Sequence, residues 1–88
     1  MCKMQFVNAY NQNILREQLF KSPENILEMI MSFQKTTKDG LEIFLMDSER
    51  RLLECEYVLY RIVEEDKMTV YKVFFKVKMA ELQPLIKE

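Results

Sequence analysis

The sequence predicts a single domain of the α+β class over residues 1–88, with N-terminal helices packed on a three- or four-stranded antiparallel meander and a short C-terminal helix. Three observations lead to this prediction. A chain of 88 residues buries roughly 60 % of its unfolded surface, which leaves room for one core. Hydrophobic residues make up 49 % of the chain and charged residues 31 %, as in an ordered globule. Helical spacing of apolar residues precedes Gly40, the only glycine, and strand-like runs follow it.

The N-terminal residues carry two competing patterns. Residues 3–10, KMQFVNAY, alternate like one face of a strand, although Phe6, Tyr10 and Ile14 also recur at helical spacing. We predict a strand for this segment. The next run, ILREQLF at residues 14–20, follows asparagines that can cap a helix and carries apolar residues at helical spacing, which predicts a short helix.

The strongest local signal is the helix that follows KSPEN. Ser22 is a good N-cap residue, and Pro23 suits the first helical position, where its missing N–H costs nothing. Lys35 lies in the predicted last turn, and Gly40 can take the positive φ of a terminating turn. The apolar stripe of this helix consists of Ile26, Leu27, Ile30, Met31 and Phe33.

The chain after Gly40 has the composition of β-strands. Apolar, β-branched and aromatic residues form runs at 41–46, 52–63 and 68–79, with turn-forming residues DSER between the first two. A helix beginning at Ser48 is the alternative for the second run. MAELQPLIKE, residues 79–88, predicts the short terminal helix.

Charge pairing sets the register of the hairpin made by the last two runs. If Glu64 pairs with Met68 around a three-residue loop at 65–67, opposite charges face each other across the strands. The two pairs are Glu54 with Lys78 and Glu56 with Lys76. The same register gathers a core face of Leu53, Cys55, Tyr57, Leu59, Val63, Tyr71, Val73, Phe75 and Val77.

The opposite face of this hairpin is the candidate functional surface. A sheet face that meets water normally carries polar side chains, whereas half of this face is apolar and needs a cover. The cover is either the chain's own termini, which would make it a second small core, or a second copy of the chain or another protein. The predicted interface residues are Val58, Tyr60, Ile62, Val70, Lys72 and Phe74.

Residue types argue against catalysis and cofactor binding. The chain has no histidine, the side chain most often used for proton transfer near neutral pH. Cys2 and Cys55 are too far apart in sequence for a zinc motif, and a single glycine excludes phosphate-binding loops. The acidic EED at residues 64–66 is typical of a solvated turn. We therefore predict no catalytic residue, no metal and no cofactor.

Charge and hydropathy narrow the class of partner. A net charge of −1 gives no overall field that would attract nucleic acid or an anionic membrane. No run approaches the ~18 apolar residues of a membrane span, and the N-terminus lacks the pattern of a signal peptide, so a cytoplasmic location is expected.

By elimination, the sequence predicts a non-enzymatic protein-binding module. This would be a small cytoplasmic regulator, adaptor or inhibitor that covers a surface of a partner protein, as a homodimer through the outer hairpin face. Two alternatives remain. One is a sheet that binds single-stranded nucleic acid through Tyr60, Phe74 and the neighbouring lysines. The other is a structural domain of a virus or mobile element without a ligand.

Overall fold

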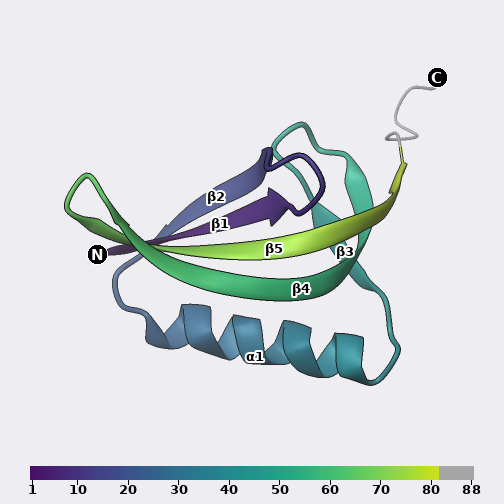
Figure 1. Cartoon of the computed structure of the whole chain (residues 1–88), viewed down its shortest axis with the longest axis horizontal. Helices are drawn as coiled ribbons and strands as arrows, with labels where there is room; N and C mark the ends of the chain where they lie inside the picture. Colours follow the sequence, from purple (N-terminus) through teal and green to yellow (C-terminus); the bar gives the residue numbers. More distant parts are fainter. Residues whose placement is uncertain (82–88) are drawn as a thin grey trace.

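The computed structural model describes residues 1–81, which form one mixed β-sheet and one α-helix (Figure 1). The elements in chain order are β1 (Cys2–Asn8), β2 (Ile14–Phe20), α1 (Glu24–Lys38), β3 (Ile43–Met46), β4 (Leu52–Glu65) and β5 (Met68–Glu81). The five strands of this part of the chain lie in the order β2-β1-β5-β4-β3. β1 and β5 run parallel, and all other neighbours run antiparallel.

The predicted architecture of N-terminal helices on an antiparallel meander is wrong. Within residues 1–81 one helix forms, and β5 lies in the middle of the sheet, between β1 and β4. The parallel β1–β5 pair joins the N-terminal hairpin to the strands that follow the helix. Both halves of the chain thereby bury an apolar face under the same helix, which a meander built only after Gly40 would not allow.

Residues 14–20 form β2 instead of the predicted helix, because the asparagines before them build a turn. The side-chain carbonyl of Asn8 accepts a hydrogen bond from the N–H of Tyr10, and that of Asn11 accepts one from Asn13, both at 2.9 Å. Such local bonds replace the helical ones and reverse the backbone. The reversal lays β2 against β1. The strand predicted at the N-terminus is confirmed as β1.

The helix predicted after KSPEN is confirmed as α1, with a different start. Pro23 occupies the N-cap position, and no side-chain hydrogen bond caps the helix, so the predicted Ser22 cap is not formed. At the other end Gly40 has a φ of 77°, the positive value predicted for the terminating turn. Ile26 and Ile30 are buried against the sheet.

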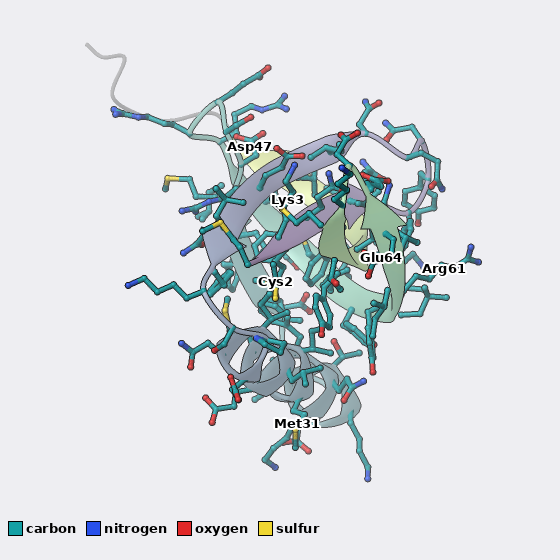
Figure 2. All side chains as sticks on the ribbon, turned by 90° about the vertical axis from the view of Figure 1, so that its left-hand side faces the viewer. Cys2, Lys3, Met31, Asp47, Arg61 and Glu64 are labelled. Atoms are coloured by element: carbon teal, nitrogen blue, oxygen red, sulfur yellow. The ribbon has the colours of Figure 1, made fainter. Side chains whose placement is uncertain are left out.

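Part of the predicted apolar stripe does not face the sheet. Leu27 and Met31 are exposed, and Figure 2 shows Met31 pointing away from the strands on the far side of the helix. A helix buries only one stripe when it lies on a single sheet, so these two residues remain in water.

The strands predicted after Gly40 are confirmed as β3, β4 and β5. No helix begins at Ser48, because the carboxylate of Asp47 accepts hydrogen bonds from the N–H groups of Glu49 and Arg51, at 2.9 and 2.8 Å, and holds a tight turn. Residues 79–81 continue β5 and contradict the start of the predicted C-terminal helix. The rest of that prediction lies outside the described residues.

The core fills the side of the sheet that faces α1, which we call the inner face. The rings of Phe6, Phe33 and Phe75 meet edge to face, with centroids 5.1 to 5.8 Å apart. The sheet is strongly curled above α1, as the end-on view in Figure 2 shows. At one end the curl brings β2 to the β3–β4 turn, where the N–H of Ser48 donates to the carbonyl of Leu15 at 2.9 Å. The side of the sheet that faces away from α1 is the outer face.

The β4–β5 hairpin closes through a shorter turn than predicted. Glu65, not Glu64, pairs with Met68, and only Asp66 and Lys67 connect the strands. Both have positive φ, 51° and 63°, which is the backbone of a type I′ turn. This turn matches the right-handed twist of the strands, whereas the predicted three-residue loop lacked the glycine or asparagine that it needs.

The shorter turn changes which side chains of β4 face the helix. From Leu59 to Val63 the strand is shifted by one residue from the predicted register, so these two residues lie on the outer face and not in the predicted core. A β-bulge at Val58, between Tyr57 and Leu59, restores the predicted register toward the start of the strand. Cys55 and Tyr57 therefore point to the inner face, as predicted.

Of the two predicted charge pairs, one is formed. Glu56 lies opposite Lys76 as predicted, but a second irregularity places Met79, not Lys78, opposite Glu54. A bulge on β5 absorbs the extra residue at this point.

Candidate functional site

Four strands supply three rows of side chains to the outer face. Residues opposite each other in neighbouring strands share a face, so the pairing register gives the rows directly. From β4 through β5 and β1 to β2, the first row is Leu59, Phe74, Val7 and Ile14. The second row is Arg61, Lys72, Gln5 and Glu17. The third row is Val63, Val70, Lys3 and Leu19.

The first row is apolar and borders a shallow hollow. Leu59 is 39 % exposed and Ile14 50 % exposed, while Phe74 between them is half-buried and Val7 is buried. The hollow measures about 310 Å³. Its lining consists of Ala9, Gln12, Val58, Leu59, Arg61 and Phe74. Arg61 lies over the ring of Phe74, with its guanidinium carbon 6.0 Å from the ring centroid, and gives the apolar floor a positive rim.

The second row changes sign across the sheet. Arg61 and Lys72 make it positive over β4 and β5, and Glu17 makes it negative over β2. Two of these charges have partners within the chain. The ammonium of Lys72 lies 3.2 Å from Glu65, and that of Lys3 lies 3.8 Å from Glu17.

Gln5, at the centre of this row, is polar and only 3 % exposed. Its side-chain N–H donates to the carboxylate of Glu17 at 2.6 Å. Its carbonyl oxygen Oε1 is buried and, among the described residues, receives no hydrogen bond. A buried acceptor without a donor costs about 1–3 kcal/mol, so this atom calls for a donor that the rest of residues 1–81 does not supply.

The structure brings together only part of the predicted interface. Val70, Lys72 and Phe74 share the outer face, but Val70 is only 1 % exposed, and Val58 sits at the bulge beside the hollow. Tyr60 lies opposite the buried Val73 and packs on the core. Ile62 is on the same inner side, opposite Tyr71, and is exposed.

Sequence reasoning missed the members of the rows outside the predicted set. They are Leu59, Arg61 and Val63 of β4 and all the residues contributed by β1 and β2. A signal for the β4 residues existed. Asp66 and Lys67 can close a two-residue turn, and a hairpin built on that turn places Leu59 opposite Phe74.

The structure bears on two of the alternatives. The N-terminal segment does not cover the outer face, because it forms strands of the sheet itself. The predicted C-terminal helix, the other possible cover within the chain, lies mostly outside the described residues. Stacking of nucleic-acid bases on Tyr60 and Phe74 required both rings on one surface, and the observed register places them on opposite faces.

Another hollow, about 590 Å³, lies beside the β3–β4 turn and is polar. Its buried carboxylate, Asp47, already accepts bonds from the backbone of Glu49 and from both the backbone and the Nε of Arg51, the last at 2.9 Å. Burial alone would raise the pKa of Asp47, but these bonds outweigh it and hold the pKa below its usual value. The group is therefore engaged in closing the turn.

The two cysteines and the acidic side chains are the other candidates for reactive or metal-binding groups. Cys2 and Cys55 are free and buried, and burial, aided by the charge of Glu54, raises the pKa of the Cys55 thiol to about 11. Such a thiol stays protonated at neutral pH and is a poor nucleophile. Across residues 1–81, no cluster of three or more Cys, Asp or Glu side chains is placed to hold a metal ion.

Within the same part of the chain, no helix has the length and apolar character required to cross a bilayer. A comparison with protein-family models, with curated proteins and with solved structures finds no match for this chain.

Proposed function

We propose that this chain is a non-catalytic protein-binding module, a small regulator, adaptor or inhibitor that works by covering a protein surface. Its contact surface is the outer face of the sheet, and the first occupant of that face is a second copy of the chain. The observation that carries the proposal is the apolar row Leu59, Phe74, Val7 and Ile14, which is exposed at both ends and crosses four strands next to a row of charges.

Composition supports an interface on this face. Aromatic and arginine side chains are enriched in protein contacts, and here Phe74 and Arg61 lie together at the hollow. A sheet face that only meets water alternates toward polar residues, which this row does not. The predicted absence of catalysis rests on the lack of histidine and of zinc- and phosphate-binding motifs in the sequence.

The size of the face sets the expected strength. Four strands at ~4.8 Å spacing and three rows at ~6.8 Å span roughly 19 by 20 Å, or about 400 Å² per copy. A standard stable interface uses about 800 Å² per partner. Self-association is therefore expected to be weak and concentration-dependent.

Light scattering over a concentration series tests the proposal. The native protein should move from monomer toward dimer, and Leu59→Glu should keep it monomeric by placing a charge in the apolar row. Leu27→Glu is a matched control, because Leu27 is 37 % exposed, close to the 39 % of Leu59, but lies on the helix. A native protein that stays monomeric throughout, or equal effects of the two substitutions, would contradict the proposal.

Ile62→Glu provides a second control within the same strand. Ile62 is exposed on the inner side of β4, whereas Leu59 is exposed on the outer face. Comparison of the two variants therefore shows whether dimerisation uses the outer face or any exposed apolar residue of the hairpin. The Ile62 variant should dimerise like the native protein.

A further inference from the structure

The charged row predicts how a second copy would sit on the outer face. We infer that two copies stack face to face about a two-fold axis that lies between the sheets, runs along the strands and passes between β5 and β1. This inference rests on the proposed function and adds the orientation of the partner and the contacts that it makes.

The strand directions allow this axis. β1 and β5 are parallel to each other. The other neighbour of β1 in the sheet is β2, the other neighbour of β5 is β4, and both of these pairs are antiparallel. The pattern of directions is therefore the same when the four strands are counted from either edge. Rotation about the proposed axis exchanges β4 with β2 and β5 with β1, so every stacked pair of strands runs in one direction, as in aligned sheet packing.

The charges select this axis over the other simple choice. With the axis along the strands, each row stacks on itself in reverse order. Arg61 then faces Glu17 of the partner subunit, twice per dimer. With the axis across the strands, Arg61 would face Arg61 of the partner subunit and Lys72 would face Lys72 of the partner subunit, which places like charges together without compensation.

The same orientation supplies the donor that Gln5 lacks. Reversal of the row places Lys72 of the partner subunit over Gln5, whose buried Oε1 receives no hydrogen bond within residues 1–81. An ammonium group has three donors, so Lys72 can keep its bond to Glu65 and still donate to Gln5. The side chains next to Gln5 in the register, Lys72 and Glu17, are long enough to move aside for this contact.

The apolar row is compatible with the arrangement. In reverse order, Leu59 meets Ile14 of the partner subunit and Phe74 meets Val7 of the partner subunit. The two exposed members of the row, Leu59 and Ile14, cover each other, whereas Val7 is only 3 % exposed and adds little contact. The arrangement thus pairs the charges of the second row, supplies a donor to Gln5 and covers the exposed ends of the first row.

Reciprocal charge reversal tests the orientation. Arg61→Glu alone should place two carboxylates against each other at each contact, and Glu17→Arg alone should place two guanidinium groups together. Each variant should therefore dimerise at least about tenfold more weakly than the native protein. In a mixed dimer of the two variants, both contacts carry opposite charges. At one contact the unchanged Glu17 of the first variant faces the unchanged Arg61 of the second, and at the other contact the two substituted side chains form the same pair in reverse. The mixture should therefore regain the native dimer mass in light scattering, and the double variant should do so by itself.

Controls separate folding from association. Circular dichroism melting should show that both single variants are folded, and Lys21→Glu, a charge reversal at an exposed residue outside the three rows, should leave dimerisation unchanged. If the native dimer is disrupted by Leu59→Glu but the double variant and the mixture of charge variants stay monomeric, the orientation is wrong and the proposed function stands. If the native protein is monomeric at every concentration, both fail.

Discussion

The turn at Asp66 and Lys67 decides the register of the hairpin. Substitution of Asp66 by glycine and by alanine tests this turn, because its backbone conformation determines which of the two variants is more stable. Asp66 has a φ of 51°, in the left-handed region. An L-residue such as alanine costs roughly 1–2 kcal/mol there, while glycine enters it freely but loses about 0.5–1 kcal/mol more chain entropy on folding. Asp66→Gly should therefore be more stable than Asp66→Ala by about 1 kcal/mol.

Thermal unfolding followed by circular dichroism measures this difference. For a chain of this size, about 1 kcal/mol corresponds to a shift of about 4–8 °C in Tm. In the three-residue loop that charge pairing had predicted, the middle residue would be right-handed, and alanine would be the better residue by a similar amount. A higher Tm for Asp66→Ala than for Asp66→Gly would refute the two-residue turn, and with it the three rows of the outer face.

Asp39 provides the matched control. It also lies next to a turn, but its φ is −80°, which any residue adopts without strain. The same two substitutions at Asp39 should give the opposite order, with alanine more stable than glycine, because only the entropy difference remains.

Two further predictions concern the core and the β3–β4 turn. Phe75→Ala should lower the free energy of unfolding by about 3–5 kcal/mol in urea titrations, since Phe75 is fully buried and its ring packs against those of Phe6 and Phe33; a loss under about 1 kcal/mol would contradict the aromatic cluster. Asp47 should make stability depend on acid pH: because its folded pKa lies below the usual value of 3.8, its contribution is present above that value and is lost as pH falls through the folded pKa. Asp47→Asn should remove the contribution of Asp47 to the difference in the free energy of unfolding between neutral pH and about pH 3, measured by urea titration. An unchanged difference would show that the carboxylate is not held as described.

Local signals predicted the elements whose structure is decided locally. The helix after Pro23 has its stop at Gly40 and an apolar face that follows from spacing alone, and it forms nearly as predicted. The prediction for residues 14–20, now β2, was wrong because ILREQLF has helical spacing when it is considered by itself. Its strand conformation depends on the asparagine turn before it and on a partner strand, β1, which in turn pairs with a strand at the far end of the chain.

The candidate site was predicted in part for the same reason. Val70, Lys72 and Phe74 alternate along one strand, so their common face follows from the sequence. The placement of Tyr60 depends on the length of one turn and on one bulge, and a shift by one residue moves a side chain to the other face. The contribution of Gln5 and Glu17 depends on strand order, which no local pattern encodes.

The position of β5 between β1 and β4 also has a consequence for how the chain folds. Met4 lies opposite Tyr71 and Phe6 opposite Val73, so the centre of the sheet joins residues from opposite ends of the described chain. Such contacts are slow to form because a long loop must close first. During synthesis the N-terminal hairpin has to wait for its neighbour, with its apolar inner face uncovered, until β5 has emerged from the ribosome. We therefore expect the β4–β5 hairpin to form early and the β1–β5 pairing to limit the folding rate.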